Sequence, residues 1–577
     1  MDWPGIGQLA LLVGLLTALT PLLGGYMARV FSGERVWLTP LLAPVERGAL
    51  RLFGAEAERD QNWKRYGLSL LAFSAASWVV LYLILATQSI HPWNPQGLGA
   101  MPWDVNFNTT TSFVTNTNWQ FYAGETTLSN FSQMAGLAVQ NFVSAAVGIA
   151  VAIALIRGIV SRSGDSLGNF WRDLTRAILY ILLPLSILAT IFFISQGVIQ
   201  NLSDYVRLTT LTGHEQVLGM GPNASQEAIK LIGTNGGGFF NVNSAMPFSN
   251  PSGLTNFVQV FLILLIPTAL TATFGRMVGS RRQGWAIFAA MMALFLVAVV
   301  VVHLAESNGS PAQHLAGIAG GNMEGKETRF GISGSSLFAA VTTVASCGAV
   351  NAAMESLTGL GGAVPMANMM TGEVIFGGVG AGLYGMLMMV LLAVFLAGLM
   401  VGRTPEYLGK RIGAREVKLV AIAALATPLT MLAGSGLAMA TKWGDPSIYN
   451  GGPQGFSETL YAYVSQAANN GSAFAGYTGF LQPNGDNVGA FGITFADLMG
   501  SAALFAGRFI PIIAILAVAG ALAGKRVAPE GAGTFRTDNP TFVVLLIGVV
   551  LLVALLTFVP ALLLGPIVQS LSEGLFA

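Results

Sequence analysis

Long apolar runs alternate with polar loops along the whole chain. Ten runs are long enough to cross a bilayer as a helix, which takes about 20 residues. They are continuous rather than alternating, so a β-barrel is not expected. The pattern predicts a polytopic helical membrane protein. The predicted spans are 5–28, 66–87, 134–156, 176–196, 256–275, 284–304, 375–401, 418–440, 498–523 and 541–565.

Composition agrees with this prediction. Hydrophobic residues make up 53% of the chain and charged residues only 10%, whereas soluble domains carry roughly 25% charged residues. The single cysteine, Cys347, excludes an intramolecular disulfide. A net charge of +1 indicates no nucleic-acid partner. The first residues contain no basic region of the kind that precedes a cleaved signal peptide, so the first run is expected to remain as a helix.

Basic residues in the loops predict an orientation. If the ten runs are helices, 22 Lys and Arg residues lie in loops on one side and five on the other. The richer side should be cytoplasmic, which places both termini outside. The long loops then face outward, and acidic residues outnumber basic ones there, so a negative vestibule that attracts cations is expected. These loops are 88–133, 197–255, 305–374 and 441–497.

A stretch of small and amide residues recurs in each long outer loop, after a short semi-apolar segment. Four equivalent positions lie 118, 112 and 123 residues apart in chain order. A period of roughly 120 residues with two spans per unit indicates a fourfold internal repeat. The equivalent positions are Asn118, Gly236, Gly348 and Gly471.

The predicted fold is an all-α polytopic membrane protein with ten transmembrane helices. Four pseudo-repeated helix–pore-loop–helix units surround a central pore, and one extra helix lies at each end of the chain. The repeats are 64–157, 174–280, 283–403 and 417–524, with residues 1–63 forming the N-terminal helix and a cytoplasmic loop and 540–577 the C-terminal helix.

Four such stretches around one axis suit a potassium filter. Non-helical backbone at membrane depth persists only where it is buried in protein or lines a water-filled path. Rings of backbone carbonyls replace the hydration shell of potassium, and short helices direct their negative C-terminal ends at a cation. No carboxylate lies in the stretches, which favours potassium over divalent ions. The candidate binding residues are Asn116, Thr117, Asn118, Thr234, Asn235, Gly236, Gly237, Ser346, Cys347, Gly348, Asn469, Asn470 and Gly471.

The glycine run 233–238 has other interpretations when it is taken alone. Such a run is most often a surface turn, and glycines can also cradle phosphate. A P-loop requires a Lys after its last glycine, and no Lys follows Gly238. The occurrence of four runs at matching places in four repeats favours the filter.

Four motifs carry a family resemblance: TNTNWQ at 115–120, GTNGGG at 233–238, SCG at 346–348 and ANNGS at 468–472. They closely resemble the four filters of the potassium-translocating A-subunit family of the bacterial Kdp ATPase. The length, the ten spans and the loop plan match as well. The resemblance implies a fold descended from fourfold potassium channels and a non-catalytic subunit that selects potassium and needs no cofactor.

The same resemblance implies partners. These are a P-type ATPase B subunit that binds ATP, a C subunit and a small single-span F subunit, together with lipid of the bacterial inner membrane. The A subunit in that family passes potassium sideways through a tunnel toward the ATPase subunit.

Several residues near the predicted filter are candidates for the pore or a gate. Gln120 follows the first filter, and Glu373, Gly377 and Gly380 begin the seventh span. The glycines there suit either tight helix packing or a broken helix whose loop obstructs the pore, and the resemblance favours the loop. Arg508 lies inside the ninth span, where an ionisable residue is a functional candidate, although it could equally be a structural partner for a nearby carboxylate.

Two other functions compete with that of a pump subunit. A stand-alone potassium transporter of the Trk, Ktr or HKT kind shares the fourfold plan, but the triple-Gly and Asn-Asn-Gly stretches argue against it. A membrane-embedded enzyme would need a cluster of His, Asp, Glu or nucleophilic residues within the spans, and the sequence contains none.

Overall fold

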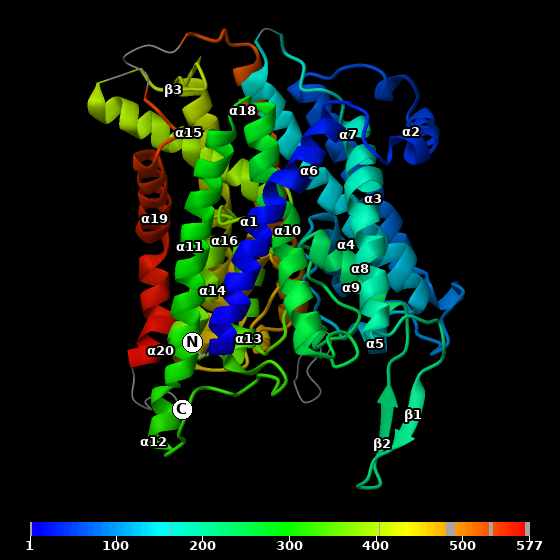
Figure 1. The fold of residues 1–577 in the computed structure, drawn as a ribbon. Helices are drawn as coiled ribbons and strands as arrows, with labels where there is room; N and C mark the ends of the chain where they lie inside the picture. The colour runs from blue at the N-terminus through cyan, green and yellow to red at the C-terminus, as the bar shows by residue number, and fades with distance from the viewer. Residues whose placement is uncertain (1–2, 163, 403, 480–490, 530–534, 572–577) are drawn as a thin grey trace.

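The chain folds into a bundle of long helices with extended loops at one end (Figure 1). The computed structural model describes residues 3–162, 164–402, 404–479, 491–529 and 535–571. Within these ranges, ten helices are long and apolar enough to cross a membrane, as the hydropathy pattern predicts. The chain is therefore a multi-pass membrane protein. Arg403, which ends the predicted third repeat, and residues 572–577 of the C-terminal segment lie outside the described residues.

The helices of the ten spans follow the predicted runs closely. Two of them are extended at their N-terminal ends by π-helical turns, at Ser132–Ala138 before α6 and at Ala177–Leu182 between α7 and α8. The helices are α1 (Trp3–Phe31), α3 (Trp63–Ala86), α6 (Val139–Val160), α7 (Phe170–Arg176) with α8 (Leu183–Ser195), α10 (Gly253–Met277), α11 (Arg281–Asn308), α15 (Ala381–Val401), α16 (Ala414–Ala440), α18 (Phe491–Ala523) and α19 (Pro540–Leu562).

Four short helices, one in each repeat, end immediately before the predicted filter stretches. The longest has 16 residues, and at 1.5 Å per residue it covers roughly 24 Å, less than the hydrocarbon core of about 30 Å. Each is therefore a half-helix that enters the bundle without crossing it. They are α4 (Trp103–Val114), α9 (Asn223–Ile232), α13 (Gly331–Val344) and α17 (Gly452–Ala467).

The second helix of the third repeat is broken, which corrects the predicted span over 375–401. The structure has α14 (Gly359–Met370), then a loop over 371–380, and only then α15. Five loop residues have positive φ, which a right-handed helix cannot include. The broken-helix interpretation is thus confirmed. The five residues are Gly372, Glu373, Phe376, Gly377 and Gly380.

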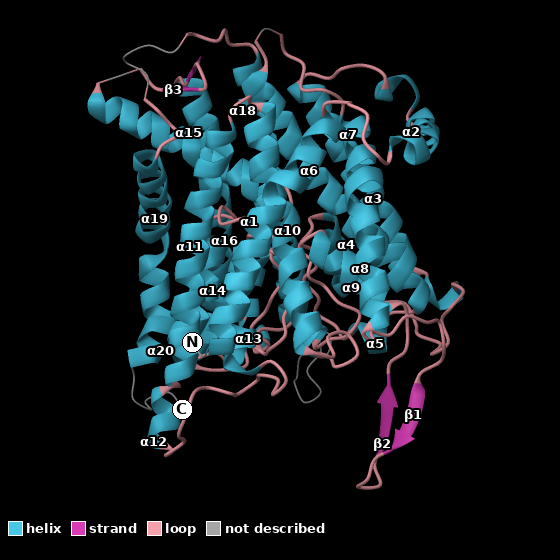
Figure 2. Cartoon of the chain, viewed as in Figure 1, coloured by secondary structure: helices cyan, strands magenta, loops and turns pink. Residues whose placement is uncertain are grey.

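The remaining elements lie at the two ends of the bundle. The exposed strands β1 (Val206–Thr209) and β2 (Glu215–Leu218) form a projecting antiparallel hairpin (Figure 2), and β3 (Glu406–Tyr407) pairs with β4 (Lys410–Arg411). The hydropathy pattern predicted neither pair, because these strands are short and β1 and β2 bury no face. The other helices are α2 (Thr39–Leu52), α5 (Gly124–Thr127), α12 (Pro311–Leu315) and α20 (Val568–Leu571), and 3₁₀ turns lie at Gly54–Ala57, Gln88–Ile90, Asn243–Ala245, Met354–Ser356 and Asp445–Ser447.

The two extra helices pack on the outside of the four repeats. Helix α1 lies along α10, and α19 contacts α11 and α15. Gly24 of α1 allows this close approach, since a Cβ atom there would overlap the carbonyl oxygen of Ala269 in α10. The start of α1 and helix α20 lie at the same end of the bundle as the β1–β2 hairpin, and α2 lies at the other end (Figure 1).

Candidate ion-filter site

The four filter stretches share one backbone conformation. In each, two residues separated by one other have positive φ, for example 48° at Thr234 and 87° at Gly236. This region is uncommon for residues other than glycine. Its recurrence confirms the register in which the four equivalent positions were aligned. The pairs are Asn116 and Asn118, Thr234 and Gly236, Ser346 and Gly348, and Asn469 and Gly471.

One hydrogen bond also recurs in all four repeats. The backbone N–H between the two positive-φ residues donates to a carbonyl five residues earlier, at 2.8 or 2.9 Å. The bond satisfies a C-terminal carbonyl of the half-helix and turns the chain into the filter. The pairs are Thr117 with Ser112, Asn235 with Lys230, Cys347 with Thr342, and Asn470 with Ser465.

The four stretches close into a ring. At three junctions, a Cβ atom added to the glycine of one stretch would overlap a carbonyl oxygen of the next. At the fourth junction, a Cβ atom on Gly237 would meet Asn118. The stretches therefore surround one axis in chain order, and the backbone approach leaves no room for side chains. The junctions are Gly236 with Cys347, Gly348 with Asn470, Gly471 with Thr117, and Gly237 with Asn118.

Side-chain amides brace the first two stretches against each other. Asn116 Nδ2 donates to the carbonyl oxygens of Gly233 and Thr234 at 3.3 and 3.2 Å. Its Oδ1 accepts from Asn235 Nδ2 at 2.6 Å and from Ser144 Oγ at 2.8 Å. These hydrogen bonds stabilise the non-helical backbone, which is strained at the positive-φ positions.

Further contacts tie the ring together and leave oxygens free. Gln120 exchanges two hydrogen bonds with the backbone of Gly238, at 3.3 and 3.1 Å. The buried side-chain oxygens of Asn118, Asn235 and Ser346 accept no hydrogen bond from the described part of the chain. Buried polar atoms are rarely left without a partner, so these oxygens indicate a place for a cation or for water.

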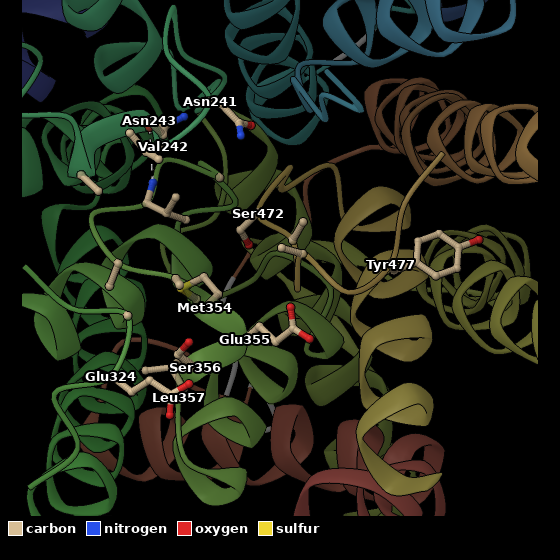
Figure 3. A pocket seen from close by; sticks show the side chains of 18 of the residues that line it. Asn241, Val242, Asn243, Glu324, Met354, Glu355, Ser356, Leu357, Ser472 and Tyr477 are labelled. Carbon is tan, nitrogen blue, oxygen red and sulfur yellow. Dashed lines mark hydrogen bonds between the residues drawn. The ribbon is translucent and has the colours of Figure 1, made fainter. Parts of the chain in front are cut away.

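A cavity of about 1270 Å³ opens on one side of the ring. All its charged lining residues within the described chain are acidic: Glu324, Glu327 and Glu355. Figure 3 shows Glu324 and Glu355 at its wall. The cavity is thus a vestibule that raises the local concentration of cations. From the ring, the lining residues include Asn118, Gly236, Gly348 and Gly471.

The loop over 371–380 is attached to the filter. The backbone N–H of Val379 donates to Thr234 Oγ1 at 2.8 Å. The N–H of Gly377 donates to the carbonyl of Val344, the last residue of α13, at 2.9 Å. The break in the third repeat therefore holds a piece of backbone against the second and third stretches.

Arg508 of α18 lies beside this loop. It is only 4% exposed. A Cβ atom on Gly148 of α6 would overlap the carbonyl oxygen of Val379 and lie 3.2 Å from Arg508 Nη2. Glu373 in the loop is close enough to Arg508 for an electrostatic interaction. The buried guanidinium group of Arg508 thus lies next to the break in the helix of the third repeat.

A second, small cavity of about 70 Å³ begins at the same level. Asn469 of the filter and Glu373 of the loop line it, together with Thr427 of α16 and Thr557 of α19. In the most apolar segment of each of these two spans, only 28% of the residues are buried inside the bundle. The cavity therefore lies beside two helices that are largely exposed at the outside of the bundle.

Two carboxyl groups meet beside the vestibule. The side-chain amide of Asn450 donates to both Glu355 and Glu458, and Glu355 accepts from the backbone of Gly476 at 2.7 Å. Burial, and next the hydrogen bond with Glu355, raise the pKa of Glu458 from 4.5 to about 7. The folded protein therefore binds this proton more tightly than the unfolded chain does.

This raised pKa predicts a pH dependence of stability. Between pH 4.5 and about 7 the unfolded chain loses the proton first, so the folded state loses stability as pH rises through that window. Glu458→Gln should flatten the fall in melting temperature over this window, whereas Glu215→Gln in the exposed hairpin should leave it unchanged. Parallel melting profiles for Glu458→Gln and the unchanged protein would contradict the assignment.

The structure brings all the predicted filter residues into one ring. Gln120 lies on its vestibule side, and the other candidates lie on the opposite side: Glu373, Gly377, Gly380 and Arg508. Sequence reasoning missed Asn243, whose Nδ2 donates to the Gly236 carbonyl at 2.7 Å. It also missed Lys230, a buried charge next to that residue. A charged residue in a semi-apolar half-helix was the available signal.

Comparisons with known proteins agree with this architecture. The family model described as Potassium-transporting ATPase A subunit matches residues 10–571. A potassium-transporting ATPase potassium-binding subunit of Mesorhizobium japonicum is 54% identical over 565 residues, 98% of each chain. One of Methylobacterium nodulans is 55% identical over 572 residues, 99% of this chain and 98% of its own.

A solved structure shares the fold at low sequence identity. The potassium transporter TrkH of Vibrio parahaemolyticus matches with a TM-score of 0.51 and 15% identity, over 89% of this chain and 98% of that one. At that identity the likeness concerns the fold alone. Because the family model and the relatives cover nearly the whole sequence, the chain belongs to the potassium-transporting ATPase A subunit family.

Proposed function

We propose that this chain binds potassium ions selectively and passes them on, as the potassium-binding subunit of an ATP-driven potassium pump. The closed ring of four filter stretches carries the proposal. Its backbone can replace the hydration shell of a monovalent cation. The names of the relatives support potassium as the ion, and the acidic vestibule supplies cations from outside.

Potassium then leaves the filter sideways rather than straight through the bundle. The loop over 371–380 and Arg508 obstruct the straight path, because backbone fills it and a positive charge repels cations. The small lateral cavity between α16 and α19 favours an exit toward a partner. An obstruction is what a pump requires, since an open channel would dissipate the gradient that the pump builds.

The partners are a B subunit that hydrolyses ATP, a C subunit and a small F subunit, in the bacterial inner membrane. Both termini lie outside, on the vestibule side. The distribution of 22 basic loop residues against five supports this orientation. This chain holds no ATP and needs no cofactor; ATP binds to the B subunit.

Purification from a native membrane tests the proposal. The chain should co-purify with an ATPase whose activity potassium stimulates. A stand-alone transporter of the Trk kind would purify without ATPase activity, and the chain alone in liposomes would then conduct potassium. That pair of results would replace the pump with the transporter.

Cys347→Ser should have little effect. The thiol is fully buried, and its hydrogen bond to the Lys230 carbonyl is long, at 3.9 Å. The carbonyl of Cys347, which faces Gly236, is unchanged by the substitution. We expect the potassium concentration that half-saturates the ATPase to change less than about threefold, the equivalent of one weak hydrogen bond. A much larger change would assign the thiol itself to the site.

A further inference from the structure

A buried polar chain lies behind the second filter stretch. Lys230 of α9 pairs with Glu227, with Nζ 2.8 Å from Oε2 and both side chains at most 1% exposed. Lys230 Nζ also donates to Asn243 Oδ1 at 2.7 Å. Asn243 Nδ2 donates in turn to the carbonyl oxygen of Gly236 at 2.7 Å. One amide side chain thus links an ammonium group to a filter carbonyl.

The orientation of this amide is determined by its neighbours. An ammonium group can only donate, so the oxygen of Asn243 must face Lys230 and the nitrogen must face Gly236. The same oxygen accepts from the backbone of Ser244 at 2.9 Å and of Val350 at 3.4 Å. Figure 3 shows Asn243 at the edge of the vestibule.

The second filter stretch differs from the other three because a side-chain amide donates a hydrogen bond to its carbonyl at Gly236. No side-chain donor on the described chain reaches the equivalent carbonyls of Asn118, Gly348 or Gly471. A carbonyl that accepts a short hydrogen bond has less charge to offer a cation, and the ammonium group strengthens the amide as a donor. Selectivity depends on the number and field strength of coordinating carbonyls.

We propose that Asn243, oriented by the Lys230–Glu227 pair, is a positioning residue that sets the ion selectivity of the outer filter. By occupying the Gly236 carbonyl, it lowers the field at that level. A weaker field favours potassium over sodium, whose tighter hydration shell needs a stronger field to replace it. The inference rests on the proposed function, because it takes the ring to be a potassium filter.

Two substitutions isolate the amide donor. Asn243→Asp retains the acceptor for Lys230 but cannot donate, and Asn243→Gly removes the side chain and tolerates the φ of 55° at this position. In the assembled complex, we expect the ratio of half-saturating sodium to potassium concentrations for ATPase stimulation to fall roughly three- to tenfold, the equivalent of one hydrogen bond. An unchanged ratio in both variants would overturn the proposal.

A matched control lies in the third repeat. Asn322 is buried beside another fully buried pair, Lys326 and Glu306, and donates to Glu306 Oε2 at 2.8 Å. It contacts no filter carbonyl, so Asn322→Gly should leave the selectivity ratio unchanged. A shift as large as that of Asn243→Gly would show that loss of any buried amide disturbs the filter, and would also overturn the proposal.

Two further variants keep the test decisive. If Asn243→Gly fails to assemble, the neutral pair Glu227→Gln with Lys230→Gln leaves Asn243 in place and should shift the ratio in the same direction. Gly236→Asp distinguishes failure of the positioning role of Asn243 from failure of the filter assignment. If it alters the ratio and the Asn243 variants do not, the positioning role fails while the filter stands. If none of them alters the ratio, the filter assignment itself fails.

Discussion

Gly236→Asp should raise the half-saturating potassium concentration of the complex by more than about tenfold, which corresponds to about 1.4 kcal/mol. Two physical effects combine. A Cβ atom on Gly236 would overlap the carbonyl oxygen of Cys347, and the φ of 87° at this position disfavours any side chain. The carboxylate would also add a negative charge to the ring and weaken discrimination against sodium, rubidium and ammonium. Potassium-stimulated ATPase activity measures both effects.

Two companion variants separate these causes. Gly236→Ala has the steric conflict without the charge, and should lose affinity but less selectivity than Gly236→Asp. Gly213→Asp, in the exposed hairpin, has a similar φ of 82° and nothing within 4 Å of its Cβ position, so its potassium response should match that of the unchanged complex. Unaltered potassium affinity and selectivity in Gly236→Asp would contradict the filter assignment.

Arg508→Ala should let potassium leak through the bundle when ATP is absent. The guanidinium is buried beside the loop over 371–380, where its charge repels cations that would otherwise continue past the filter. Its removal should raise passive potassium flux into liposomes at least about tenfold, equivalent to about 1.4 kcal/mol of barrier. The number of potassium ions moved per ATP should fall accordingly.

The conservative variant distinguishes charge from packing. Arg508→Lys keeps the positive charge at this level and should leak much less than Arg508→Ala. Equal leaks would indicate that Arg508 acts by filling space against Gly148. Coupled transport that is unchanged in Arg508→Ala would refute its role in the barrier.

The sequence alone determined the spans, the fourfold repeat and the positions of the four non-helical stretches. Hydropathy locates the ten spans, because a helix in lipid must be predominantly apolar over about 20 residues. The repeat is visible because each unit needs small or amide residues where the backbone turns left-handed, as at Asn118 and Gly471. These requirements concern the local backbone conformation, so they can be recognised in the local sequence.

The tertiary structure decided what depends on contacts between distant residues. Hydropathy extended the seventh span to 375, but Val379 and Gly377 bond to Thr234 and Val344 instead of continuing a helix. Asn243 contacts the Gly236 carbonyl only because the chain folds back after the second stretch. These hydrogen bonds join groups that no periodic pattern in the sequence connects. They can form only once the four repeats have closed around one axis.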